Sequence, residues 1–116
     1  MSITIDDVAG MDFSDVAEAG KLKPIHAGEI LREEFMKPMG LSASAVAVAL
    51  HVPAPRINDI VLERRGISAD TAVRLARFFG MPAEFWMGLQ ADYDRRMAEN
   101  KLAVMLPQIR RYQAAA

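Results

Sequence analysis

The sequence contains no cysteine and only two histidines, His26 and His51. The absence of cysteine excludes disulfides and thiolate metal sites, and it is typical of a cytoplasmic protein. No apolar run approaches the roughly 20 residues that a membrane-spanning helix needs. The first residues have neither a basic start nor a continuous apolar stretch, so we expect no secretory signal. We therefore predict a cytoplasmic protein with no membrane contact, no metal and no small-molecule cofactor.

The chain also has almost no net charge, at −1, but its charges are unevenly distributed. Residues 1–20 carry five acidic side chains and no lysine or arginine, which leaves ten acids and fourteen bases in the remainder. Such asymmetry between two parts of a chain is typical of an interaction arm attached to a body of opposite charge. We predict an acidic arm over residues 1–25, partly ordered or flexible.

Helical patterns fill the rest of the sequence, and no segment has the alternation of a strand. Ser42 and Ser68 stand where N-caps are expected, and Gly40 and Gly80 stand where helices should end. With 52% apolar residues the chain can build a packed core. We predict an all-α, compact five-helix bundle, divided into a domain at 26–82 and a C-terminal helical extension at 83–116. The expected helices cover residues 28–39, 43–50, 53–62, 69–79 and 83–106.

The joint between the second and third predicted helices is very short. Two helices connected by so few residues cross steeply, which is the helix-turn-helix arrangement. Ala47 is small enough for close approach, Val52 can fill the angle, and Ile57 and Ile60 can anchor the second helix to the core. The turn residue, His51, then needs a positive φ, at a cost of about 1 kcal/mol relative to glycine.

These anchors leave the start of the 53–62 helix facing outward, as in helices that enter the DNA major groove. Arg56 can form a bidentate contact with guanine, and Asn58 can do the same with adenine. Ala54 and Pro55 offer apolar contacts, for example to a thymine methyl group. The alternative is a solvated helix face, or an intrachain pair of Arg56 with a nearby acid, Asp59 or Glu63. The anchor spacing favours the groove contact.

Phosphate contacts are predicted on both sides of this helix. Arg64 and Arg65 follow it in a loop. The N-terminus of the preceding helix, with Ser42 and Ser44, presents backbone N–H groups that suit another phosphate. Because the basic surplus is small, tight binding would need two copies on paired half-sites.

The last predicted helix is longer than a small core requires. We predict that its apolar residues Leu89, Tyr93 and Met97 pair with a second subunit, and the alternative is that they pack across the bundle of their own chain. By contrast, His26 and Glu29 lack the H-E-x-x-H spacing of a zinc hydrolase, and His26 is expected to pack or to cap the first helix. No combination of nucleophile, base and metal ligands is apparent, so we predict no catalysis.

From His26 to Met97 the chain resembles the HigA antitoxins, a branch of the Xre-type helix-turn-helix proteins. The segments that carry this resemblance are "HAGEILREEFMKPMGLS", "VPAPRINDIV", "RRGISADTAVRLARFFG" and "PAEFWMGLQADYD". Ala27 departs from the proline common in the family. Glu63 departs from the glycine or basic residue usual in that loop.

The resemblance implies a lambda-repressor-like fold and a cytoplasmic, dimeric repressor. Such proteins bind the operator of their own operon and neutralise HigB, a RelE-like toxin that cleaves mRNA. The DNA-facing positions would be Ala54, Pro55, Arg56 and Asn58, with Arg64 and Arg65 as the basic loop. Toxin-binding residues cannot be carried over, although the acidic arm is a candidate. Two alternatives stay open, namely a stand-alone transcriptional regulator and an interaction module without DNA binding.

Overall fold

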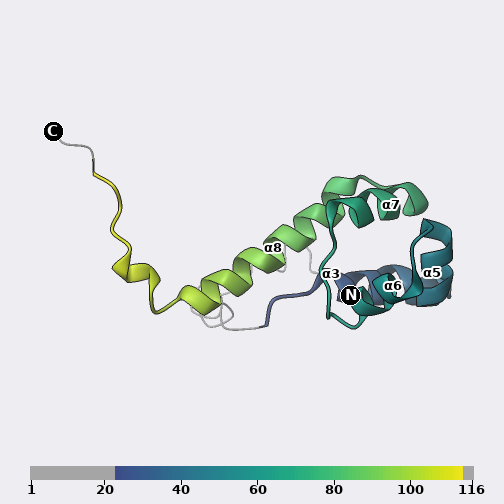
Figure 1. Cartoon of the computed structure of the whole chain (residues 1–116), viewed down its shortest axis with the longest axis horizontal. Helices are drawn as coiled ribbons and strands as arrows, with labels where there is room; N and C mark the ends of the chain where they lie inside the picture. The colour runs from purple at the N-terminus through teal and green to yellow at the C-terminus, as the bar shows by residue number, and fades with distance from the viewer. Residues whose placement is uncertain (1–22, 114–116) are drawn as a thin grey trace, which may run out of the picture.

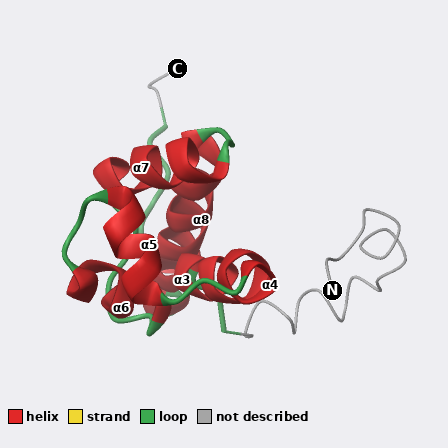
Figure 2. Ribbon diagram, turned by 90° about the vertical axis from the view of Figure 1, so that its right-hand side faces the viewer, coloured by secondary structure: helices red, strands yellow, loops and turns green. Residues whose placement is uncertain are grey.

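The computed structural model describes residues 23–113, so nearly all of the predicted arm lies outside the described residues. Within this range the chain forms five helical segments and no strand, which confirms the all-α prediction (Figures 1 and 2). The first segment runs through α3 (Ala27–Ile30), a π-helix (Leu31–Met36) and α4 (Lys37–Met39). It is followed by α5 (Ala43–Leu50), α6 (Ala54–Val61), α7 (Ala69–Phe79), α8 (Ala83–Leu102) and a 3₁₀ turn (Leu106–Gln108).

The first segment differs from the predicted α-helix because its middle is a π-helix. The N–H of Lys37 bonds to the carbonyl of Arg32, five residues earlier. Pro38 cannot donate a backbone hydrogen bond, and its ring would collide with a carbonyl in a regular α-helix. The wider π turn accommodates the proline without breaking the helix.

The last helix ends earlier than predicted, at Leu102 instead of Leu106. Pro107 has no N–H to continue the hydrogen-bond ladder, and it disfavours α-helical geometry at the residue before it. The chain therefore leaves α8 through turns and continues away from the body (Figure 1).

All five helical segments contribute to one core. Leu31, Val46, Ile57, Leu75 and Trp86, one from each segment, are fully buried. The inward faces expected from the sequence are confirmed in α5 and α6, where the buried residues are Val46, Ala47, Leu50, Ile57, Ile60 and Val61. The packing of α5 against α6 therefore fixes the orientation of the helix-turn-helix pair.

In the turn between α5 and α6, His51 has the left-handed backbone conformation that the sequence predicts. His51 has φ 58° and ψ 45°, and its N–H bonds to carbonyls at the end of α5. The N–H of Val52 bonds to the carbonyl of Ala47 at 3.0 Å. The imidazole is exposed, so the unfavourable backbone geometry at His51 is not compensated by burial of its side chain.

We expect His51→Gly to raise the free energy of unfolding by up to about 1 kcal/mol, because glycine adopts a positive φ without steric cost. The greater freedom of glycine in the unfolded chain reduces this gain. Urea unfolding of His51→Gly and His51→Ala measures the effect. A clear loss of stability in His51→Gly would mean that the imidazole makes a stabilising contact.

Candidate nucleic-acid interface

The N-terminal half of α6 is presented outward. Pro53 precedes the helix with φ −62° and is its N-cap. Ile57 and Ile60 are 0% exposed and hold one side of the helix to the core. Pro55 and Asn58 are exposed, as predicted, and Ala54 is half-buried. The first turn and a half of α6 is therefore the part of this helix that can reach a ligand.

Arg56 has an intrachain partner that neither sequence alternative named. Its Nη1 lies 3.0 Å from Oδ1 of Asp70, and 32% of its side chain is exposed. The pairing considered from sequence, with Asp59 or Glu63, was wrong, because Asp59 lies against Arg65 and Glu63 lies against Arg32. Asp70 stands in the first turn of α7 and approaches Arg56 from across the turn between the helices.

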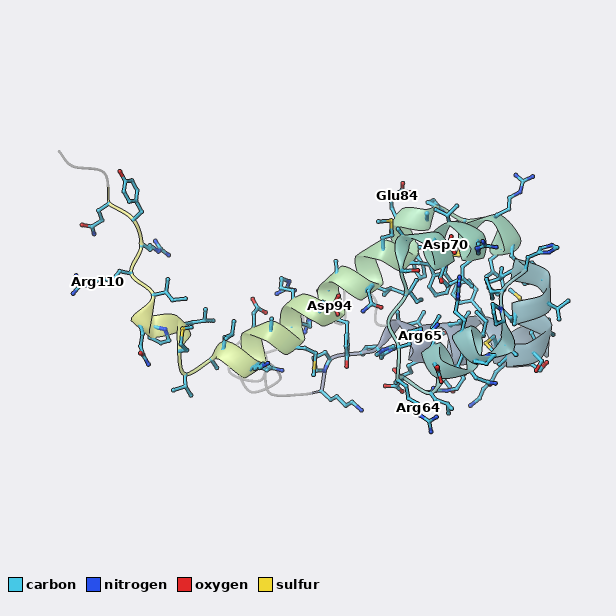
Figure 3. All side chains as sticks on the ribbon, in the orientation of Figure 1. Arg64, Arg65, Asp70, Glu84, Asp94 and Arg110 are labelled. Atoms are coloured by element: carbon cyan, nitrogen blue, oxygen red, sulfur yellow. The ribbon has the colours of Figure 1, made fainter. Side chains whose placement is uncertain are left out.

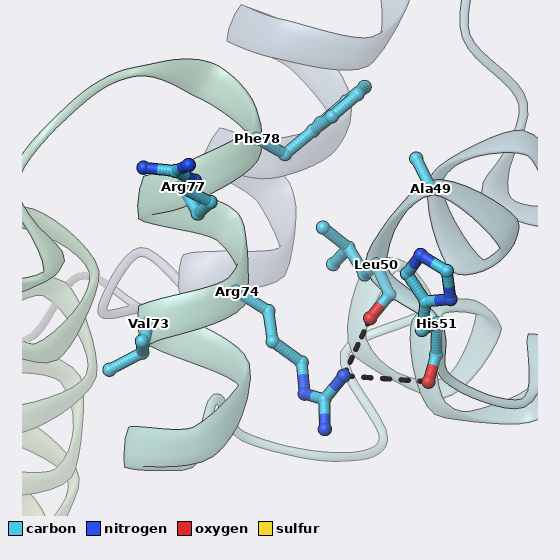
Figure 4. Close-up of a pocket in the computed structure, with 7 residues that line it drawn as sticks. All are labelled: Ala49, Leu50, His51, Val73, Arg74, Arg77 and Phe78. Atoms are coloured by element: carbon cyan, nitrogen blue, oxygen red, sulfur yellow. Dashed lines mark hydrogen bonds between the residues drawn. The ribbon is translucent and has the colours of Figure 1, made fainter.

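Asp70 binds a second arginine as well. Its Oδ1 accepts a bond of 2.7 Å from Nε of Arg74, one turn further along α7. The hydrogen bond from Arg74, followed by the nearby positive charges of Arg74 and Arg56, holds the pKa of Asp70 below its ordinary value. Asp70 therefore stays ionised at neutral pH. Arg74 also donates to the carbonyl of Leu50 at 2.7 Å, at the end of α5 (Figure 4).

The loop after α6 places two further cations beside the helix. The backbone N–H groups of Arg64 and Arg65 bond to the carbonyl of Asp59 at 2.8 and 3.2 Å. Both side chains are exposed, and Arg64 projects outward from the body (Figure 3). Nη2 of Arg65 lies 3.8 Å from Oδ2 of Asp59. Arg56 and Arg65 together line a hollow of about 270 Å³.

The end of α6 is braced by residues that sequence reasoning missed. Nη1 of Arg32 donates to the carbonyl of Val61, and its Nη2 lies 3.6 Å from Oε2 of Glu63. Glu63 itself has φ 63°, a left-handed geometry. Related proteins often have glycine at this position, and glycine adopts a positive φ without steric cost. That difference was the one sequence signal that could have indicated the left-handed geometry of Glu63.

The start of α5 is capped by Ser42, as predicted, whereas a phosphate contact there stays a prediction. Oγ of Ser42 accepts from the N–H of Ala45 at 3.0 Å, which makes Ser42 the N-cap. Ser44 is exposed in the first turn. Neither serine lines the hollow beside Arg56, so they form a separate part of the predicted surface.

The three predicted dimer residues have different surroundings. Leu89 packs against the core, and the ring of Tyr93 lies 4.7 Å from the ring of His26. Met97 is 44% exposed. His26 is buried, and its Nδ1 accepts from the N–H of Gly28 at 2.9 Å, which confirms its expected role as a cap.

No group of three acidic or histidine side chains among residues 23–113 is arranged to hold a metal ion. In the same range, no helix has the length and apolar content needed to cross a membrane.

Comparison with known proteins identifies the family. A family model described as helix-turn-helix matches residues 33–86. Virulence-associated protein I of Dichelobacter nodosus is 61% identical over 83 residues, which cover 70% of this chain and 77% of the relative. The Pseudomonas aeruginosa antitoxin HigA, solved with the higBA promoter, is 46% identical, with a TM-score of 0.75. The match covers 78% of this chain and 99% of that antitoxin. This chain belongs to the HigA family of Xre-type helix-turn-helix proteins.

A second HigA-like structure was solved on DNA. Antitoxin GraA in complex with its operator is 47% identical, with a TM-score of 0.75, over 80% of this chain and 95% of GraA. The matched 33–86 range contains all eight residues predicted to contact DNA. These residues are Ser42, Ser44, Ala54, Pro55, Arg56, Asn58, Arg64 and Arg65. These residues thus all lie within the matched helix-turn-helix domain.

Proposed function

We propose that this protein is an antitoxin and transcriptional autorepressor that acts without catalysis in the cytoplasm. The observation that carries the proposal is the start of α6, which is anchored by Ile57 and Ile60, presents Arg56 beside Arg65 and leaves Asn58 exposed. A helix start with these side chains suits base edges, and the loop arginines suit phosphates. The HigA and GraA structures solved with promoter or operator DNA support this assignment.

The second part of the proposal is a toxin partner. HigA-family membership supports a RelE-like, HigB-type nuclease as the protein that this chain neutralises. Co-purification with the product of the adjacent reading frame, followed by footprinting of the complex on the shared promoter, tests both parts. Protection of the promoter without toxin binding would favour the stand-alone regulator. Toxin binding without any protection would exclude the repressor.

The third part is a homodimer, which would place two α6 helices on paired half-sites. The chain beyond α8 projects from the body (Figure 1). Several of its apolar side chains are exposed. Val104 is 86% exposed, Ile109 59% and Tyr112 91%. Exposed apolar groups of this kind mark protein interaction sites. Together with the exposed Met97, they form the dimer surface that we propose.

We expect the double variant Val104→Asp/Ile109→Asp to be monomeric in multi-angle light scattering, at a concentration where the wild type is dimeric. Two buried charges at an interface have a large desolvation cost. The fold should persist because both side chains are exposed in the single chain. Val48→Asp, at a valine on α5 that is 77% exposed, is the matched control and should stay dimeric. A dimeric double variant would place the interface elsewhere.

A further inference from the structure

A line of polar contacts runs from α5 through α7 to Arg56. The carbonyl of Leu50 accepts from Nη1 of Arg74 at 2.7 Å, and a longer contact of 3.5 Å joins the same nitrogen to the carbonyl of His51 (Figure 4). Nε of Arg74 donates to Oδ1 of Asp70 at 2.7 Å, and that oxygen also accepts from Nη1 of Arg56 at 3.0 Å. Arg74 and Asp70 of α7 thus link the end of α5 to Arg56 on α6.

This arrangement restricts the motion of Arg56. An arginine side chain on a helix surface otherwise samples many rotamers, and ordering it on binding has an entropic cost that weakens the affinity. The Asp70 carboxylate is itself fixed by Arg74 and by its place in the first turn of α7, whose N-cap is Ser68. Within the described residues 23–113, Arg56 makes its side-chain hydrogen bond through Nη1, and a guanidinium has five N–H donors. The other N–H groups of Arg56 therefore remain available to bind a DNA base, and the side chain is already oriented before DNA arrives.

The same carboxylate also carries a negative charge at the proposed DNA surface. The side chain of Asp70 is 59% exposed and lines the hollow with Arg56 and Arg65. A negative charge there repels the phosphates of every DNA sequence equally. Specificity is a difference between two affinities, so this equal repulsion cancels in it, and the discrimination comes from the base contact of the oriented Arg56.

We propose that Asp70 is a specificity-determining residue, which positions Arg56 for base reading, while its charge weakens binding to DNA of every sequence. The proposal rests on the proposed function, because it requires that this surface binds an operator. It assigns Asp70 a role through Arg56 and not through direct contact with a base.

The test is Asp70→Asn, a change of nearly equal size that removes the charge. Binding is measured by fluorescence anisotropy on a promoter duplex chosen by footprinting and on a scrambled duplex of equal composition. The scrambled duplex should bind the variant more tightly than the wild type. The ratio of promoter to scrambled affinity should fall about three- to tenfold, as expected when one arginine is no longer oriented.

Asp92→Asn is the matched control. Asp92 also accepts from two arginines, Arg95 and Arg96, and 52% of its side chain is exposed, but it lies on α8. Its replacement changes the net charge equally and should leave the affinity ratio unchanged. A loss of the ratio in Asp92→Asn as large as in Asp70→Asn would reduce the effect to overall charge and overturn the proposal.

A double variant separates positioning from a general effect on the fold. If Asp70 acts through Arg56, then Asp70→Asn should have no further effect on the affinity ratio when Arg56→Ala is already present. An unchanged ratio in Asp70→Asn, or equal losses in both Arg56 backgrounds, would overturn the inference. A wild-type protein that bound both duplexes equally would instead overturn the proposed function.

Discussion

Replacing Arg56 by alanine should weaken binding to the promoter duplex by about 1–3 kcal/mol and relax the base preference at one position of each half-site. Arg56 is the one arginine of α6, and its guanidinium is already oriented by Asp70 at 3.0 Å. Its removal deletes a base contact and also leaves the carboxylate of Asp70 facing the DNA with one partner fewer. Anisotropy titrations on single-base variants of the promoter measure both effects.

Arg65→Ala is the matched control for Arg56→Ala. Arg65 lies in the loop after α6 with 51% of its side chain exposed, where a phosphate contact is proposed. Its loss should weaken binding to promoter and scrambled duplexes alike and reduce the salt dependence of the affinity. Equal losses on both duplexes for Arg56→Ala would remove Arg56 from the base-reading residues.

Gly28→Ala should produce the largest loss of stability, about 3 kcal/mol in the free energy of unfolding by urea. A Cβ atom at Gly28 would lie 1.8 Å from the carbonyl oxygen of Ile60. That oxygen belongs to the backbone of α6, so no side chain can move aside to make room. The substitution must separate α3 from the helix that presents Arg56, and DNA binding should weaken in parallel.

Gly88→Ala is the control for this substitution. Gly88 lies within α8, and among residues 23–113, apart from its chain neighbours and the nearby backbone of α8, no atom would lie within 4 Å of its added Cβ. Alanine is the better helix former by about 1 kcal/mol, so Gly88→Ala should stabilise the protein. Unchanged stability in Gly28→Ala would contradict the close packing of α3 against α6.

The helices and their ends could be predicted from the sequence because their signals are local. Ser42 and Ser68 accept hydrogen bonds from N–H groups three residues later. Gly40 and Gly80 adopt φ 65° and 68° at helix ends, and His51 adopts φ 58° in the turn. Each of these features depends on a few neighbouring residues and on the spacing of apolar residues along the helix, and a single sequence contains both kinds of information.

The contacts of Arg56 and Arg32 could not be predicted in the same way. Arg56 pairs with a residue 14 positions away, and Arg32 with a carbonyl 29 positions away. Local spacing favoured a partner within one helical turn, such as Asp59, whereas tertiary packing brought Asp70 closer. On α8 the spacing of apolar residues shows which face is buried, but not whether a second subunit or the same chain buries it. Tyr93, which we predicted to contact a second subunit, packs on His26 of its own chain.

The central claim is that the start of α6 enters a DNA groove, and the absence of natural cysteine makes a direct test possible. A cysteine introduced as Asn58→Cys can carry a DNA-cleaving iron chelate, and Asn100→Cys on α8 provides a distant comparison. Bound to the promoter duplex, the label at position 58 should cut within the footprint at two symmetric positions, and the label at position 100 should cut weakly. Strong cutting from position 100 with none from position 58 would contradict the account.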